Sequence, residues 1–436
     1  MQIKTPTLKH TLYFIFSLWL IFLIWYGRGY FYDEAPDAGR EAFYAGSNRY
    51  IPDETNAAVA IAGINAPENT DFIKRGRYVI DMNNQSFDFD DKGLSKKILE
   101  EMPKLNFVSF DKADEIDCKQ QDAIEIEYEQ CTKPEIVSKL LGQNKLLLNR
   151  YFSLHKIIDW QGFSGNGQLL INLNRLLWSQ NKLLISQGNY EKSYQLWRNN
   201  HVFISRVLGQ ESNMIDRAIF QAVDSRSLDS IEYLLYKNPE TILKHADELM
   251  ALLKPLGLAR YNLKGLMRAE YTFINNSVMN RKNAGKAVHI EYMRNRMYRF
   301  HLDFLNRTHE PERTLSASER ELSQKYSLIT IKTFLRAFLP HGPSRLLADL
   351  LIGGQVRGLM LVKSMHHKSA MINLLNLSIK IRQQSIDANH IQTFLNKASK
   401  EYNCPFTEYP MVFDKVKKTI YCENPEQKKG GAEVRL

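Results

Sequence analysis

The spacing of the four cysteines in this 436-residue chain decides which thiol chemistry is open to them. They form two local pairs, Cys118 with Cys131 and Cys404 with Cys422. No CxxC motif occurs, and no Cys/His cluster has the spacing of zinc ligands. The segments MVF and TIYC, joined through DKVKK, favour two short strands that would bring Cys404 and Cys422 together. Whether the pairs form structural disulfides or stay as free thiols then depends on the compartment.

Three other features resemble reactive motifs, and each has an explanation without chemistry. GFSGNG, residues 162–167, has no GKS/T ending and follows a predicted helix, so we interpret it as a helix connection. His366 and His367 are adjacent, whereas metal ligands on a helix need i, i+4 spacing. Glu270 lies among basic residues and is a candidate acid or base, although a structural ion pair also explains it. No GxSxG or HExxH motif occurs, so the sequence predicts no catalytic, metal-binding or cofactor-binding residue.

The composition is that of an ordered globular protein with a positive net charge. Hydrophobic residues make up 44% of the chain and charged residues 24%, and the length suffices for two or three packed units. The formal net charge is +10 at pH 7. A charge of this size suggests nucleic acid as a partner, but its distribution along the chain says more than its total.

An uncharged apolar run near the N-terminus predicts one membrane-spanning helix. It extends from Leu12 to Tyr26 and, with its edges, gives about 17 residues, the lower limit for crossing a bilayer as a helix. Lys4 and Lys9 precede the run, which favours a cytoplasmic N-terminus. The expected segments are a cytoplasmic tail at 1–8 and a transmembrane anchor at 9–26.

Two alternatives to an uncleaved anchor fit this run less well. A cleaved signal peptide needs a small-x-small site directly after the run, where this chain has Trp25-Tyr26-Gly27-Arg28. A buried core helix of this length would carry a polar face, which the run lacks. One span places the remaining chain outside the cytoplasm, where thiols tend to oxidise, and this favours the disulfide between Cys404 and Cys422.

An acidic zone follows the predicted anchor. Residues 27–52 lack periodicity and are predicted to be a juxtamembrane linker, and residues 53–133 a small acidic subdomain of mixed α/β structure. In the latter, NFVSFD and AIEIEYEQC alternate apolar and polar residues as strands do. Clustered carboxylates suit a calcium ion, but no DxDxDG loop is present, so we interpret them as a solvated face.

From Pro134 onwards the apolar residues follow a helical period. Residues 134–310 predict an irregular stack of antiparallel helices, in which LLISQGNYEKSYQLWRNN resembles one helix turn of tetratricopeptide-type repeats. A C-terminal helical domain at 311–403, a hairpin at 404–425 and a flexible tail at 426–436 complete the chain. The predicted fold class is mainly α, with one transmembrane helix, a small mixed acidic subdomain, a TPR-like or solenoid-like body and a short C-terminal β-hairpin.

A basic stretch at residues 254–301 is the candidate interaction surface. Arginines there alternate with aromatic residues in EYMRNRMYRFHLDFLNR, a mixture that suggests RNA in a cytosolic protein. Because nucleic acid is scarce outside the cytoplasm, we favour an anionic partner, a phospholipid surface or the chain's own acidic zone. An exposed helix face, with arginine stems lying along apolar surface, remains the simplest explanation. The candidate surface residues are Arg268, Arg294, Arg296, Tyr298, Arg299 and Phe300.

Three segments resemble a loose group of largely uncharacterised, inner-membrane-anchored periplasmic proteins of Gram-negative bacteria. NAAVAIAGINAPENTDFIKRGR is similar to an Ala-x-x-Gly-Ile/Phe-x-Ala-Pro segment that follows their anchor. LLNRYFSLHKI and LWRNNHVFISRVLGQESNMIDRAIFQA are similar to their helical core. CPFTEYPMVFDKVKKTIYC resembles their closing hairpin, with Cys404 in place of an acidic residue and Glu408-Tyr409 in place of Gly-Lys. The resemblance offers no catalytic residues to carry over, and it implies a link to envelope-spanning secretion machines such as the type VI apparatus.

These observations lead us to expect a non-enzymatic adaptor that is anchored in the inner membrane and docks periplasmic or envelope proteins. Its expected partners are inner-membrane lipid, through the N-terminal helix, and one or more envelope proteins. An envelope enzyme acting on peptidoglycan or lipid, with Glu270 as acid or base, is the first alternative. An immunity-type or structural binding protein is the second.

Overall fold

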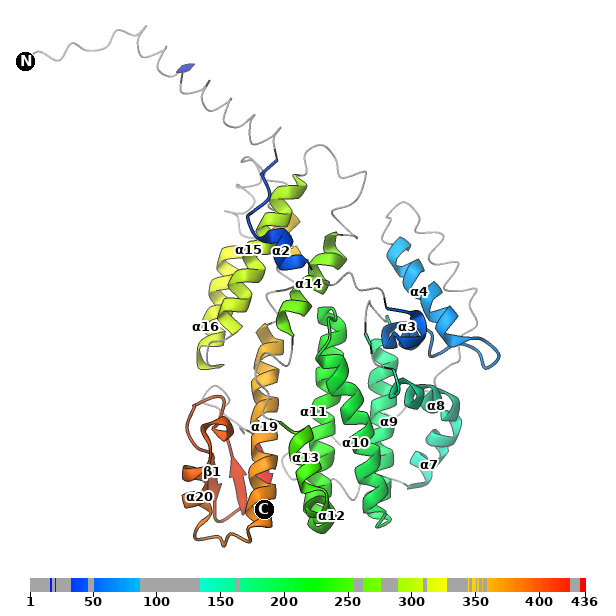
Figure 1. Ribbon diagram of the computed structural model, residues 1–436, viewed down its shortest axis with the longest axis vertical. Helices are drawn as coiled ribbons and strands as arrows, with labels where there is room; N and C mark the ends of the chain where they lie inside the picture. Colours follow the sequence, from blue (N-terminus) through cyan, green and yellow to red (C-terminus); the bar gives the residue numbers. More distant parts are fainter. Residues whose placement is uncertain are drawn as a thin grey trace, which may run out of the picture. The chain divides into compact units, whose positions relative to one another are not determined.

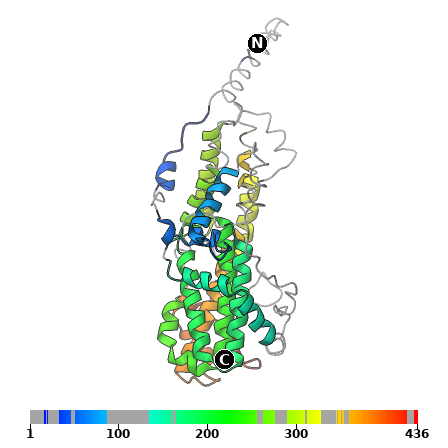
Figure 2. The same cartoon turned by 90° about the vertical axis from the view of Figure 1, so that its right-hand side faces the viewer.

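Figure 1 shows the computed structural model of the chain, and Figure 2 the same view turned by 90°. The structure describes residues 33–45, 51–86, 134–157, 159–160, 165–254, 262–275, 289–308, 312–327, 359–423 and 432–436, with a few single positions near 16–20 and 344–355. Two compact units are present. Unit 1 comprises Met1–Ala45, Tyr271–Arg307 and Ala317–Gly358, and unit 2 comprises Gly46–Glu270, Thr308–Ser316 and Leu359–Leu436.

Helices dominate the described residues, which confirms the prediction of a mainly α protein. Most of the predicted anchor and the acidic zone from 87 to 133, including Cys118 and Cys131, lie outside the described residues. No helix within the described ranges combines the length and the apolar character that crossing a bilayer requires.

The body of unit 2 is built on long helices that lie side by side in both views. α9 (Gly167–Ser186), α10 (Tyr190–Leu208) and α11 (Met214–Lys237) each pack against the other two. The predicted turn at Gly188-Asn189 is confirmed. Gly188 has a φ of +72°, which L side chains rarely adopt, and α10 begins two residues later.

Two helices of this body are enclosed by other elements. α11 packs on α9, α10, α12 (Pro239–Lys244) and α19 (Leu359–Gln383), and α19 also contacts the C-terminal strands. Both therefore carry buried polar side chains besides their apolar ones. The Asn213 side chain accepts the backbone N–H of Asp216 at 2.9 Å, which caps α11 and explains where that helix begins.

Short helices complete unit 2. α7 (Pro134–Gln143) and α8 (Lys145–Leu154) cover α9, and α13 (Ala246–Leu252) follows α12. The part of the predicted acidic subdomain that is described is helical, and it belongs to the same apolar core as α8 and α9. It consists of η1 (Asp53–Thr55), α3 (Ala57–Ala62) and α4 (Phe72–Ser86).

Glycine allows α3 and α4 to approach each other closely. A Cβ atom on Gly63 would lie 1.8 Å from the carbonyl oxygen of Phe72, and one on Gly76 would lie 1.8 Å from that of Val59. Because both obstacles are backbone atoms, no side-chain movement could relieve either clash. The glycines of AGINAP and IKRGR are therefore a packing requirement of this helix pair.

Arg150 of α8 joins the AGINAP segment to the helical core. Its guanidinium donates to the carbonyl oxygens of Ile64 (2.9 Å), Ala66 and Pro67 (3.0 Å). Asn166, just before α9, donates to two carbonyl oxygens at the C-terminal end of α3. These side chains satisfy backbone groups that the end of a short helix leaves open. Two of the segments that carry the resemblance are thus in direct contact through Arg150.

The C-terminal part of unit 2 is a three-stranded antiparallel sheet with the order β1-β2-β3. β1 (Val412–Asp414) and β2 (Thr419–Tyr421) form the predicted hairpin, and Asp414 accepts two backbone N–H groups in its turn. β3 (Glu433–Arg435) pairs with β2, so the prediction of a flexible tail at 426–436 was wrong for the last residues. The physical reason is burial, because Val434 is fully enclosed against this sheet and α19. α20 (Ile391–Lys397) and η6 (Lys400–Tyr402) lead into β1.

Unit 1 is organised around α15 (Ile290–Thr308). α2 (Arg40–Tyr44), the end of α16 (Glu312–Leu322) and the π-helical turn η5 (Ser323–Ser327) also belong to it, and α14 (Leu263–Ile274) has residues in both units. Its buried aromatic core includes Phe300, Phe304 and Tyr326.

Residues 33–45, part of the predicted juxtamembrane linker, are held by specific contacts with α15. The Asp33 carboxylate accepts two backbone N–H groups at the start of α15, at 2.7 and 2.9 Å. Asn295, which is fully buried, accepts from the Asp37 N–H and the Arg40 guanidinium. It also donates to the carbonyl oxygen of Ala35. Acidic residues of the first segment therefore fix the N-terminal half of α15.

Candidate functional site

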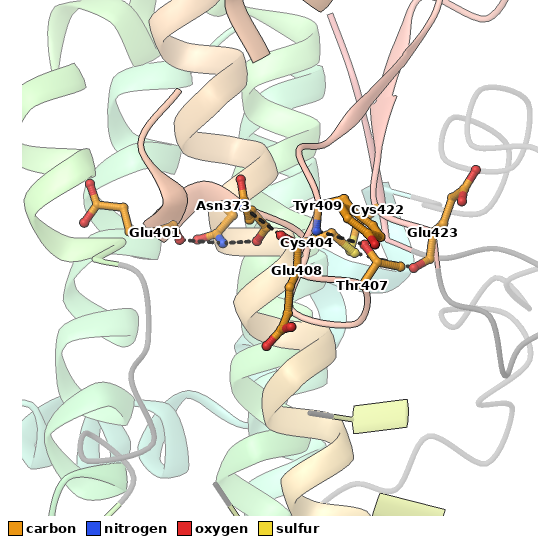
Figure 3. Close-up of a disulfide and its surroundings, with 9 residues drawn as sticks. Asn373, Glu401, Cys404, Thr407, Glu408, Tyr409, Cys422 and Glu423 are labelled. Carbon is orange, nitrogen blue, oxygen red and sulfur yellow. Dashed lines mark hydrogen bonds between the residues drawn. A yellow bond between two sulfur atoms is a disulfide. The ribbon is translucent and has the colours of Figure 1, made fainter. Parts of the chain in front are cut away.

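The disulfide between Cys404 and Cys422 closes the base of the β1–β2 hairpin, as predicted. Both cysteines are buried, and Figure 3 shows them beside α19. The backbone N–H of Cys404 donates to the carbonyl oxygen of Tyr409, and that of Cys422 donates to the carbonyl oxygen of Ala432. Asn373 of α19 donates to the carbonyl oxygens of Glu401 and Asn403, just before the bridge. The bridge is therefore part of the packing between the sheet and α19.

The predicted interaction surface on the basic stretch consists largely of residues that already have partners in the chain. Arg299 forms two hydrogen bonds with the Asp37 carboxylate, at 2.7 and 2.8 Å. Arg294 pairs with Glu291 at 2.6 Å. Arg296 pairs with Asp349 at 2.5 Å, and its guanidinium lies over the Tyr326 ring. In unit 2, Arg268 pairs with Glu211 at 3.3 Å.

The two aromatic candidates of this stretch are also engaged. The Tyr298 ring packs edge-on against Phe43 of α2. Phe300 is fully buried, so its assignment to a surface was wrong. The alternation of arginine and aromatic residues along α15 reflects a helix with one face in the core and another bound to acidic residues. The acidic partners are Glu34, Asp37, Glu291 and Asp349. They lie in separate parts of the sequence, so they do not stand out as one acidic zone.

Glu270 has a structural role in unit 2. Its carboxylate accepts the backbone N–H of Met214 at 2.5 Å, which caps the first turn of α11. A carboxylate at a helix N-terminus is stabilised by the helix dipole. This contact is a helix cap, whereas the structural alternative expected from the sequence was an ion pair.

A buried charge cluster, defined here as His201, Arg217, Asp224 and Lys368, was not found from the sequence. The Asp224 carboxylate pairs with the Lys368 ammonium, and its other oxygen lies 3.1 Å from His201 Nδ1. All four side chains are at most 2% exposed. Arg217 donates to the carbonyl oxygens of Leu208 and Gln210.

The electrostatics of this cluster depend on the carboxylate. Burial lowers the pKa of Lys368 well below its usual range, and the positive charge of Arg217 lowers it further. The carboxyl group in contact with Lys368 is that of Asp224. The cluster comes from α10, α11 and α19, so no local spacing in the sequence marks it. The only signal is that α11 and α19 carry polar residues on every face.

A small half-open pocket, called here the polar pocket, lies where α9, α10 and α11 meet. It is lined by three asparagines, two tryptophans, two serines, Arg226 and three aliphatic residues. The room in it for ordered water is about 30 Å³. Within the described ranges no three His, Cys, Asp or Glu side chains gather as a metal site.

The asparagines of the polar pocket use their carbonyl oxygens inside the protein. Asn174 Oδ1 accepts from the Tyr151 hydroxyl at 3.3 Å and from the Asn200 amide at 3.2 Å. Asn200 Oδ1 accepts from Tyr151 at 2.8 Å, and Asn181 Oδ1 accepts from Ser193 at 2.5 Å. An amide nitrogen carries two hydrogens, and one of each pair is donated within the protein.

Arg226 is the charged residue among those that line the polar pocket, and it acts on Asp229 together with Lys182. Burial raises the pKa of Asp229 to about 6, while the positive charges of Arg226 and Lys182 act in the opposite direction. The Lys182 ammonium lies over the Trp178 ring, 5.0 Å from its centre. Two positive groups and one weakly acidic carboxyl thus give the region a positive balance near neutral pH.

Glu232 should make unit 2 less stable as the pH rises. Burial raises its pKa to about 8, with Asp229 and Glu433 adding repulsion, and Arg435 partly compensates. Between an unfolded pKa of about 4.3 and this folded value, the folded state binds more protons, so the free energy of unfolding falls with pH. We expect a loss of about 2 kcal/mol between pH 6 and 8.

Guanidinium unfolding at the two pH values measures this loss. Glu232→Gln removes the titrating group, so its stability should vary less over the same interval. Glu240→Gln, an exposed change on α12, should keep the pH dependence of the wild type. A pH dependence that persists in Glu232→Gln would contradict the assignment.

Comparison of the chain with protein-family profiles, with curated proteins and with solved structures found no match.

Proposed function

We propose that the chain is a non-enzymatic adaptor of the bacterial envelope, anchored in the inner membrane by its N-terminal helix and extending into the periplasm. It docks other envelope proteins through its helical body. The single observation that carries the location is the disulfide between Cys404 and Cys422, buried between the sheet and α19. Structural disulfides persist in oxidising compartments and are rare in the cytosol.

The docking role is supported by the architecture of unit 2. Helices stacked side by side give a protein an extended lateral surface, which repeat-like proteins use for binding. The contacts of 33–45 with α15 are consistent with an anchor that is firmly joined to unit 1. By analogy with the proteins it resembles, the docked partners belong to a secretion apparatus such as the type VI machine, whose assembly or position the adaptor sets.

The location is tested with reporters and a thiol probe in living cells. Alkaline phosphatase, fused after Leu436, is expected to be active, whereas a cytosol-dependent fluorescent protein at the same position should stay dark. Cys404 and Cys422 should resist alkylation by N-ethylmaleimide until the protein is unfolded and reduced. Activity of the cytosolic reporter alone, or reduced thiols at both positions after denaturation in alkylating buffer, would exclude the periplasm.

Partner docking is tested separately by proximity labelling. A labelling enzyme fused after Leu436 should mark a small, reproducible set of envelope proteins in living cells. The same enzyme, secreted to the periplasm without this chain, provides the background. A labelling pattern identical to that background would argue against an adaptor.

A further inference from the structure

The tip of the β1–β2 hairpin carries the most exposed large hydrophobic side chain among the described residues. Val416 is 93% exposed, and Lys415, Lys417 and Lys418 around it are exposed as well. A single exposed apolar side chain is common on protein surfaces and needs no explanation by itself. What distinguishes this one is the backbone that holds it and the charge that surrounds it.

Hydrogen bonds fix the shape of the tip. The Asp414 carboxylate accepts the backbone N–H groups of Val416 at 2.9 Å and of Lys417 at 3.0 Å. The carbonyl oxygen of Lys418 accepts the backbone N–H of Leu436 at 3.0 Å, and the disulfide closes the base of the hairpin. The valine and its lysines are therefore presented by a preorganised turn, which lowers the entropy cost of binding.

The backbone of Lys418 is a second, independent observation at the tip. Its φ is +54°, in the left-handed region that glycine adopts readily and other residues adopt seldom. The side chain is exposed, so the core does not require a lysine here. A glycine or an asparagine would close the same turn with less strain. A lysine kept in this conformation indicates a use for its positive charge.

The positive charge of the tip is only partly balanced by nearby carboxylates. None of the three lysines forms a salt bridge within the described part of the chain. Asp387 lies near Lys415, and its pKa is lowered first by the hydrogen bond with His390 and to a smaller extent by Lys415. The Asp414 carboxylate is already used by the backbone of the turn. With three lysines against these two carboxylates, the tip keeps a net positive charge.

The shape of the tip favours a lipid surface over a protein as the partner. A protein would need a matching acidic hollow for this convex tip, whereas the headgroup region of a bilayer adapts to a protrusion. Lysine ammonium groups act as point charges and bind phosphate without the directional fork of arginine. Their aliphatic stems lie along apolar surface while the charge stays among the headgroups. An apolar side chain at the apex enters the same region of the bilayer.

We propose that residues 415–418 bind the surface of an anionic phospholipid bilayer. The three ammonium groups contact lipid phosphates, and the Val416 side chain enters the headgroup region. Each lysine near such a surface strengthens binding by a factor of about five. The contact is weak by itself, but a chain already held at a membrane meets the lipid at a high effective concentration. It goes beyond the proposed docking of proteins, because it gives unit 2 a membrane contact that needs no protein partner.

The test compares the full chain reconstituted in vesicles of phosphatidylcholine with phosphatidylglycerol and in vesicles of phosphatidylcholine alone. Acetylation by a membrane-impermeant N-hydroxysuccinimide ester, followed by mass spectrometry, measures how accessible each lysine is. Lys415, Lys417 and Lys418 should react several-fold more slowly in the anionic vesicles, and high salt should abolish the difference. Lys139, an exposed lysine on α7, should react equally in both kinds of vesicle and is the internal control.

Two substitutions separate lipid binding from folding. Lys418→Gly removes one charge and relieves the left-handed backbone, so the guanidinium midpoint should stay or rise while the protection of the other two lysines falls about fivefold. Val416→Thr keeps the shape of an exposed side chain and should reduce the protection without changing the midpoint. Lys139→Gln is the matched control, because it removes an equal charge elsewhere in unit 2 and should leave the protection of the tip unchanged.

Three results would overturn the proposal. They are equal acetylation of the tip in both kinds of vesicle, slower acetylation that includes Lys139 to the same degree, and protection that Lys418→Gly leaves unchanged. Protection of the tip by soluble polyglutamate in the neutral vesicles, equal to that by the anionic lipid, would replace the membrane by an acidic polypeptide. None of these results depends on the compartment or on a protein partner, so the proposed adaptor function would be unaffected.

Discussion

Asp224→Ala is expected to lower the free energy of unfolding of unit 2 by about 3–5 kcal/mol. The substitution leaves the buried Lys368 side chain without its carboxyl partner, and it removes the Asp224 oxygen that lies 3.1 Å from His201 Nδ1. All of these groups are buried, so water cannot replace the lost partner. The loss therefore reflects buried polar groups left without a partner more than the lost volume.

Guanidinium unfolding followed by tryptophan fluorescence measures this effect, because Trp160, Trp178 and Trp197 all lie in unit 2. The informative control is Asp224→Leu combined with Lys368→Met. Replacing both partners by apolar side chains of similar size is often neutral or even stabilising. A loss below about 1 kcal/mol for Asp224→Ala, or an equal loss in the double variant, would show that the pair carries no special energy.

The double variant also separates stability from specificity. Buried ion pairs can be retained because they fix one arrangement of helices. If the double variant is stable but exchanges its amide hydrogens faster along α11 and α19, the cluster specifies how these helices pack. Unchanged exchange would assign it a role in stability alone.

Local sequence patterns predicted the elements that depend on local chemistry. The turn at Gly188-Asn189 follows from one glycine, and the β1–β2 hairpin follows from alternating residues around DKVKK. The third strand escaped prediction because EVR is too short to show a period. Only its pairing with β2 and the burial of Val434 define it.

Contacts distant in sequence account for what the sequence did not reveal. The ion pairs of Arg299 with Asp37 and of Arg40 with Glu291 join residues more than 250 positions apart. Nothing in the composition of residues 33–45 indicates that they bind to α15. The polar pocket is hidden for the same reason, since Ser227 on an enclosed helix looks like any small core residue.

Removal of the disulfide by Cys404→Ala with Cys422→Ala is expected to destabilise unit 2 by about 3 kcal/mol. The bridge spans 18 residues, and closing a loop of this length restricts the unfolded chain by about that amount. The sheet should be affected first, because β2 is the neighbour of β3 among the described strands, and β3 therefore depends on the position of the hairpin. Hydrogen exchange of Ile420 and Val434 amides, together with the guanidinium midpoint, reports both effects.

A reducing agent provides the matched comparison. Dithiothreitol should lower the unfolding midpoint of the wild type towards that of the double variant and leave the double variant itself unchanged. Because Cys118 and Cys131 remain in the double variant, any effect of reductant on it would come from that second pair. A wild type that is insensitive to reductant after full reduction of Cys404 and Cys422 would mean that packing on α19 alone holds the sheet. The disulfide would then give no reason to expect that the protein must fold in an oxidising compartment.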